Sequence, residues 1–201
     1  MRDLASAINR IFWGLIFVII NVNIIYFDIF PDFIGYFMIL AALSKLQSYS
    51  VYFSKAKIFA VILALYAIPL WFIPDLLLTE GFHPSSETVY FLLSTVVHTF
   101  LHIGLIYMIL CGIIEISEKC TLSNWINRIG KGLRLYVYTM FVCWTIIPFV
   151  LNMTENAAMI TLIGTMMFSF IMELMIIVLI RKFRNSINSL NAITLKSIKS
   201  I

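Results

Sequence analysis

Charged residues are scarce in this chain, and their scarcity argues against a soluble protein. Aspartate, glutamate, lysine and arginine make up 12% of the 201 residues, whereas 62% are hydrophobic and the mean hydropathy is +1.00. A soluble domain of this size could not cover so much apolar surface. The net charge of +4 does not indicate a nucleic-acid partner, because the basic residues are placed to orient a membrane protein.

Cysteine is rare, and the common catalytic motifs are missing. The three cysteines, Cys111, Cys120 and Cys143, have no CxxC spacing and are expected to be free thiols, not a disulfide framework or a zinc site. The sequence contains no GxSxG, no P-loop, no HExxH and no paired glutamates of the intramembrane prenyl-protease type. An enzymatic function is therefore not favoured, and no cofactor is expected.

Long apolar runs dominate what is present. They predict an all-α bundle of six transmembrane helices in residues 1–180, followed by a basic cytoplasmic tail over 181–201 that rests on anionic lipid or is disordered. The first run is too long for a signal peptide and lacks a cleavage site, so it is expected to stay as an anchor. The predicted spans cover about residues 11–29, 32–46, 56–78, 88–114, 133–151 and 157–180.

A short cytoplasmic helix is predicted before the fifth span. Ser123 is expected to cap it, and Gly130 and Gly132 to end it. Its apolar side is expected to consist of Trp125, Ile126 and Ile129. Its apolar side and basic surroundings predict that it lies in the plane of the membrane interface.

The placement of charge predicts the orientation. With a cytoplasmic amino terminus, the six spans put every lysine and arginine of the chain on the inside. The outer segments then hold only acidic residues, so both termini are expected in the cytoplasm. The inner basic residues are Arg2, Arg10, Lys45, Lys55, Lys57, Lys119, Arg128, Lys131, Arg134, Arg181, Lys182, Arg184, Lys196 and Lys199.

Two polar stripes run through the predicted spans. On the fourth span Ser94, His98 and His102 recur every four residues, beside Thr95 and Thr99. A spacing of four keeps side chains on one helix face, so each stripe predicts a polar seam. The stripe of the sixth span consists of Thr161, Thr165, Ser169 and Glu173.

The seams have two interpretations. In the functional one, His102 and Glu173 lie at similar depths and form a buried site that relays a proton, holds a cation or binds a polar solute. In the structural one, the hydroxyls bond to their own helices, the histidines bond to neighbouring hydroxyls, and Glu173 is neutral or reaches toward Arg181. A metal site is not expected, because His98 and His102 have zinc-like spacing but no clear third ligand.

Two further polar groups complete the candidate site. Asn21 and Asn23 are predicted near mid-membrane on the first span, where an asparagine faces the bundle to find a hydrogen-bond partner. At the outer end of the bundle, an acidic mouth is predicted from Asp28, Asp32 and Asp75. It either concentrates cations at an entrance or only reflects the outward bias of acidic residues in the topology.

The stretch DIFPDFIGYFMIL resembles a segment of small, uncharacterised six-helix integral membrane proteins of Gram-positive bacteria. In those proteins Asp or Asn precedes a PDF(I/V)GY turn and an apolar helix. The resemblance is local and implies a bacterial plasma membrane but no activity. The matching residues are Asp28, Pro31, Asp32, Phe33, Ile34, Gly35 and Tyr36.

Two functions are therefore predicted as alternatives. The first is transport or capture of a small solute or ion through the seam between the fourth and sixth spans. The second is an accessory, sensor or immunity role exerted through a membrane-protein partner. Either function has the lipid bilayer as its surroundings, and the sequence leaves the oligomeric state open.

Overall fold

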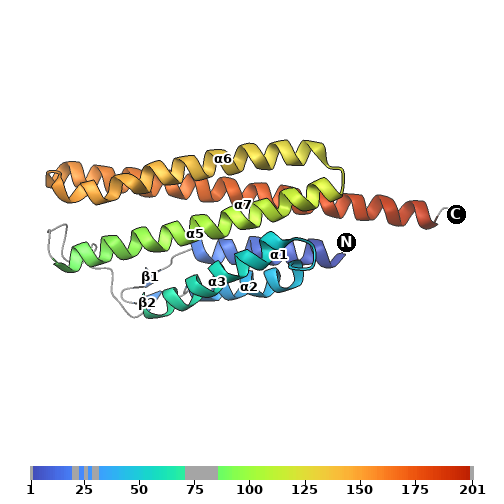
Figure 1. The fold of residues 1–201 in the computed structure, drawn as a ribbon, viewed down its shortest axis with the longest axis horizontal. Coiled ribbons are helices and arrows are strands. Elements are labelled where there is room, and N and C mark those ends of the chain that lie inside the picture. Colours follow the sequence, from blue (N-terminus) through green and yellow to red (C-terminus); the bar gives the residue numbers. More distant parts are fainter. Residues whose placement is uncertain (1, 20–22, 25–26, 29–31, 71–85, 200–201) are drawn as a thin grey trace.

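The computed structural model describes residues 2–19, 23–24, 27–28, 32–70 and 86–199. The described residues are all-α apart from one short β pairing, and the helices run roughly along the long axis of the molecule (Figure 1). The α-helices within these residues are α1 (Arg2–Ile19), α2 (Asp32–Leu46), α3 (Val51–Leu70), α5 (Ser86–Lys119), α6 (Ser123–Ile146) and α7 (Glu155–Lys199).

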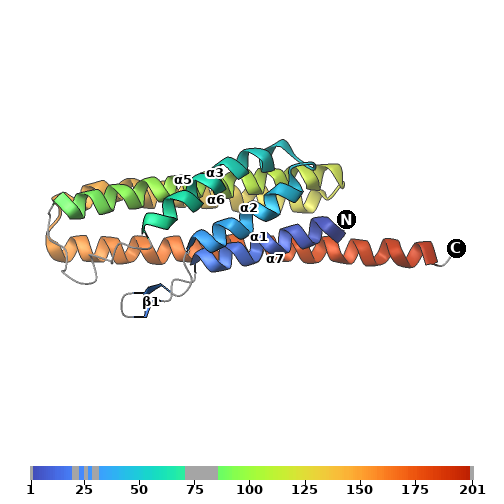
Figure 2. The ribbon, with the colours of Figure 1, turned by 90° about the horizontal axis from the view of Figure 1, so that it is seen from below.

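The helices form a closed ring. Each packs against its neighbours in chain order, and α7 returns to pack against α1. Both termini lie at the same end of the long axis (Figures 1 and 2). Every lysine and arginine of the six helices falls in the half of its helix nearest that end. We term it the basic end and the opposite one the far end.

Four of the helices are long and apolar enough to cross a membrane. The four segments are Val51–Pro69, Leu93–Lys119, Ser123–Asn152 and Glu155–Leu190. The other two helices are shorter: α1 has 18 residues with three charges, and α2 has 15 residues. At 1.5 Å per residue they extend about 27 and 22 Å, less than the roughly 30 Å of a hydrocarbon core.

The first helix lies closer to the amino terminus than predicted. α1 covers Arg2–Ile19 and not residues 11–29, because Leu4, Ile8 and Leu15 form one buried apolar stripe that starts before the long hydrophobic run. Beyond it, the strand β1 (Asn23–Ile24) pairs antiparallel with β2 (Phe27–Asp28).

The backbones of α1 and α2 touch where two glycines meet. A Cβ atom on Gly14 would lie 2.8 Å from the carbonyl oxygen of Gly35, and one on Gly35 would lie 2.7 Å from that of Gly14. Small residues let helices approach this closely. α2 begins and ends at the residues predicted for the second span, Asp32 and Leu46. Gly35 and Tyr36 of the PDFIGY segment thus lie in its first two turns.

The next two helices extend beyond their predicted bounds at the basic end. α3 begins at Val51, five residues before Ala56, and contains Pro69 in its last turn. Residues 71–78 of the predicted third span lie outside the described residues. α5 continues past residue 114 to Lys119, where Glu115 and Lys119 form an ion pair of 2.7 Å one turn apart.

The predicted interfacial helix is wrong. α6 is continuous from Ser123 to Ile146 through Gly130 and Gly132, because Ile129, Leu133 and Tyr136 recur on one buried face. Tertiary packing therefore overrides the low helix propensity of glycine. A 3-10 helix, η1 (Ile147–Asn152), follows with a proline in its first turn.

The tail is not separate from the sixth span. α7 runs unbroken for 45 residues, well past residue 180, and extends beyond the other helices at the basic end (Figure 1). Phe183 and Ile187 stay buried in this stretch. Trp125 of α6 donates a hydrogen bond to Ser186, and Arg184 bonds to Asn9 of α1. The prediction of a disordered tail is therefore wrong through residue 199.

Candidate functional site

A buried tyrosine of α2 joins the two histidines of α5. Tyr36 is completely buried, and its hydroxyl lies 3.1 Å from Nε2 of His98 and 3.1 Å from Nδ1 of His102. The two histidines are one helical turn apart, so a single hydroxyl from the facing helix reaches both. The stripe of α5 therefore faces the centre of the ring.

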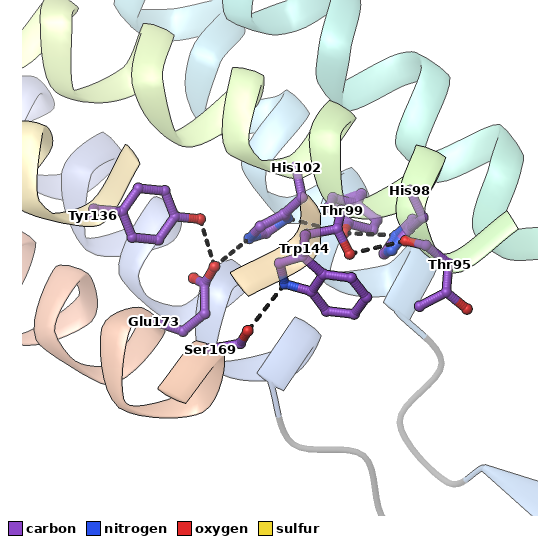
Figure 3. Close-up of polar contacts among 9 residues, drawn as sticks. Thr95, His98, Thr99, His102, Tyr136, Trp144, Ser169 and Glu173 are labelled. Carbon is purple, nitrogen blue, oxygen red and sulfur yellow. Dashed lines mark hydrogen bonds and ion pairs between the residues drawn. The ribbon is translucent and has the colours of Figure 1, made fainter. Parts of the chain in front are cut away.

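Glu173 of α7 lies beside His102, as the functional interpretation of the seams expected. Its Oε1 is 3.3 Å from Nε2 of His102 and accepts a hydrogen bond of 2.6 Å from the hydroxyl of Tyr136 on α6 (Figure 3). The histidine, the glutamate and the tyrosine are each less than one tenth exposed. Four helices thus contribute to one buried polar network.

The distances are consistent with one assignment of the protons. If Nε2 of His102 donates to the carboxylate, its Nδ1 is an acceptor in the neutral ring. Tyr36 then donates to Nδ1, and its oxygen accepts from Nε2 of His98. This assignment follows from the hydrogen-bond pattern. It gives a directed chain from His98 through Tyr36 and His102 to Glu173.

The chain ends at a carboxylate that is only half satisfied. Oε1 of Glu173 has two donors, but Oε2 is buried and accepts no hydrogen bond from any residue that the structure describes. Leaving a buried acceptor unpaired costs about 1–3 kcal/mol, and more when the group is charged. Oε2 of Glu173 can therefore take up a proton or accept a hydrogen bond from a bound solute.

Polar side chains continue from this network toward the far end. Tyr66 of α3 stacks on His98 with ring centroids 5.7 Å apart, and its hydroxyl lies 2.7 Å from the hydroxyl of Ser94. One turn beyond Glu173, Ser169 accepts a hydrogen bond of 3.0 Å from Nε1 of Trp144 (Figure 3). The seam therefore continues from the network for at least one turn on each of two helices.

Toward the basic end the interior is apolar. Between His102 and Ser117, about 22 Å along α5 at 1.5 Å per residue, the buried large side chains of that helix are all leucine or isoleucine. On α7, the buried residues that follow Glu173 are also apolar as far as Ile187. These residues, together with buried apolar side chains of the other four helices, fill the interior of the ring between the network and the basic end. We term them the apolar layer. They are Ile103, Leu105, Ile106, Ile109, Leu110, Ile113 and Ile116 on α5 and Ile176, Ile177, Leu179, Ile180, Phe183 and Ile187 on α7.

The structural interpretation of the seams is confirmed in part. Thr99 donates to the carbonyl of Thr95, and Thr161 to that of Ala157, each on its own helix. Both histidines bond to the hydroxyl of Tyr36, as this interpretation expected, but His102 also lies beside Glu173. Glu173 does not reach toward Arg181, whose guanidinium lies 5.7 Å from the ring centre of Phe12.

Two further predicted site residues, Thr165 and Asn23, lie outside the network. Thr165 is buried on α7, two turns from Glu173 toward the far end. Asn23 lies in β1 and pairs with Asp28 of β2, so the prediction that it sits within the first helix is wrong.

The acidic mouth is largely untested by the structure. Asp32 lies in the first turn of α2, half-buried and one turn before Tyr36. The side chain of Asp28 is not described, and Asn21 and Asp75 lie outside the described residues. The concentration of cations at an entrance therefore stays a prediction.

The sequence pattern did not identify the aromatic partners of the seam. Tyr36, Tyr66, Tyr136 and Trp144 each place a hydroxyl or indole N–H on a residue of the two stripes. The available signal was their position: a tyrosine or tryptophan inside an apolar helix, away from the interfaces, needs a hydrogen-bond partner. The three cysteines are free thiols, as predicted.

No protein-family model, curated protein or solved structure matches this chain. The comparisons therefore assign no activity to the network. The local resemblance of the PDFIGY segment stays a prediction. In the part of the chain that the structure describes, no three histidine, cysteine or acidic side chains gather as a metal site would require.

Proposed function

We propose that the ring lies in a bilayer as a six-helix unit, with the basic end and both termini in the cytoplasm. The bias of lysine and arginine toward one end supports this orientation. α1 and α2 are short, but they close the ring between α7 and α3, each of which contains a candidate span. The far end then faces outward.

Within that arrangement the protein captures a small polar solute from the outer side. The observation that carries this proposal is the buried Oε2 of Glu173, which no described residue satisfies. The polar seam continues from it toward the far end, whereas the apolar layer separates it from the cytoplasm. Such an arrangement suits an outward-facing binding site more than a continuous pore.

The charges around the site favour a cationic solute. No lysine or arginine occurs in residues 11–44, 58–118 or 135–180, which include the network and the seam. Glu173 lies in the network, and Asp32 lies one turn from Tyr36. A protonated amine would donate hydrogen bonds to Oε2, and the rings of Tyr66 and Trp144 on the seam are of the kind that accommodate such cations.

The test is a titration of the purified protein with ammonium and methylammonium chlorides, against sodium chloride at equal ionic strength. A bound cation stabilises the fold by mass action, so the midpoint of thermal unfolding rises with its concentration. We expect this rise for the wild type and its loss in Glu173→Gln. The matched control is Glu155→Gln, at an exposed position in the first turn of the same helix.

The two variants separate the possible outcomes. If Glu173→Gln unfolds without added salt while Glu155→Gln does not, Glu173 is structural and the capture proposal fails. If both variants keep the rise, the cations bind elsewhere and the proposal also fails.

A second candidate, an accessory protein that acts through a partner, is favoured by one observation. The carboxyl-terminal part of α7 extends beyond the bundle at the basic end (Figure 1). Cationic residues of α6 lie at the same end. Making Arg128, Lys131 and Arg134 acidic is expected to release a co-purifying membrane protein if this role holds.

A further inference from the structure

A groove lies on the outside of the ring between α5 and α6. It has a volume of about 850 Å³ and is lined mainly by apolar and aromatic side chains. Leu135, Tyr138 and Phe141 line it from α6, and each is more than half exposed. Tyr107 lines it from α5. Because this face points away from the interior of the ring, a protein in a bilayer would present it to lipid.

The groove has one charged side chain. Arg134 lines it at the end nearest the basic end, and its Nε donates a hydrogen bond of 3.3 Å to the carbonyl of Gly130. Among the residues that the structure describes, Arg134 forms no ion pair with a carboxylate. Its remaining N–H groups are thus available to an anion from outside the chain.

The charge lies at the depth that a phospholipid headgroup would occupy. Beyond Arg134, α6 continues to Ile146 and rises about 18 Å at 1.5 Å per residue. The six residues of η1 add about 12 Å at the 2.0 Å per residue of a 3-10 helix. The total of about 30 Å matches the hydrocarbon thickness of a bilayer. Arg134 therefore falls at the cytoplasmic boundary of the acyl region. Tyr107 and Tyr138 lie beside it, where aromatic side chains favour the interface.

We propose that this groove is a binding site for an anionic phospholipid of the cytoplasmic leaflet. Arg134 holds the phosphate, and an acyl chain lies along Leu135, Val137 and Phe141. The groove therefore complements a phospholipid: its guanidinium matches the anionic headgroup, and its apolar lining matches an acyl chain. The inference rests on the membrane orientation proposed above and is independent of the solute at Glu173.

The test measures lipid binding to the full-length protein by native mass spectrometry. Dioleoyl phosphatidylglycerol and dioleoyl phosphatidylcholine are titrated separately into protein in mild detergent. The variant Arg134→Gln removes the charge from an exposed side chain. The control Lys45→Gln removes an exposed charge at the basic end of α2, which is opposite α6 in the ring.

We expect one phosphatidylglycerol to bind at least about tenfold more tightly than phosphatidylcholine. Arg134→Gln removes this preference and Lys45→Gln retains it. Equal weakening by both variants would mean general surface attraction and would overturn the proposal, as would full binding by Arg134→Gln.

A partner helix is the alternative occupant of the groove. Tyr138→Cys in a background without the native cysteines tests it by oxidative crosslinking in native membranes. Absence of a crosslinked product supports the lipid site. A specific crosslink to a second copy or another protein contradicts it.

Discussion

Replacing Tyr36 by phenylalanine is the most informative single change in the network. The ring of Tyr36 is completely buried and is retained in the variant, so packing is preserved. Only the hydroxyl is lost, and with it the contacts of 3.1 Å to His98 and to His102. Both histidine nitrogens then lose their partner on α2.

The magnitude follows from these two bonds. At about 0.6 kcal/mol for an average hydrogen bond inside a membrane protein, their loss costs about 1.2 kcal/mol. Leaving the nitrogen of the buried His102 unsatisfied adds about 1–3 kcal/mol. The free energy of unfolding is therefore expected to fall by about 2–4 kcal/mol, which lowers the unfolding midpoint by several degrees.

The assay is thermal unfolding in detergent, followed by circular dichroism. Tyr90→Phe is the matched control, because Tyr90 is also helical but 74% exposed and its side chain is expected to contribute little. If Tyr36→Phe unfolds at the same temperature as Tyr90→Phe, the hydroxyl does not join α2 to α5 and the network is wrong.

Two further predictions concern helix packing. Gly35→Ala is expected to lower the unfolding midpoint and to loosen α1 from α2, because the added Cβ would lie 2.7 Å from the carbonyl oxygen of Gly14. Gly130→Ala adds a Cβ that meets no atom within 4 Å, so it is expected to be neutral or to stabilise the protein by up to about 1 kcal/mol. A lower unfolding midpoint for Gly130→Ala than for Gly35→Ala would contradict this packing. Trp125→Phe loses the bond to Ser186 and is expected to make the end of α7 more sensitive to limited proteolysis; an unchanged cleavage rate would mean that this bond does not hold the helix.

The sequence predicts the helical class and the second helix well, because hydrophobic runs and a proline or aspartate at a helix start are local signals. It fails at α1, α6 and the end of α7, where burial against distant helices decides the bounds. The glycines 130 and 132 are an example: their low helix propensity predicts a break, but the buried residues around them continue the helix. Such packing is not encoded within one segment.

The candidate site was likewise predicted only in part from the sequence. Spacing alone placed His98 and His102 on one face, and the position of Glu173 in an apolar span suggested an interior role. The tyrosines that join them come from α2 and α6, and their selection depends on how the ring closes. The unpaired Oε2 also emerges only from the assembled structure.

The most direct test of the central claim is labelling of single cysteines one turn on either side of Glu173. Ser169→Cys and Ile177→Cys, without the native cysteines, are exposed in intact cells to a charged, membrane-impermeant thiol reagent. The polar seam and the apolar layer predict that Ser169→Cys reacts from outside, whereas Ile177→Cys does not. Equal reaction of both, reaction of Ile177→Cys alone, or no reaction at residue 169 would contradict an outward-facing site closed toward the cytoplasm.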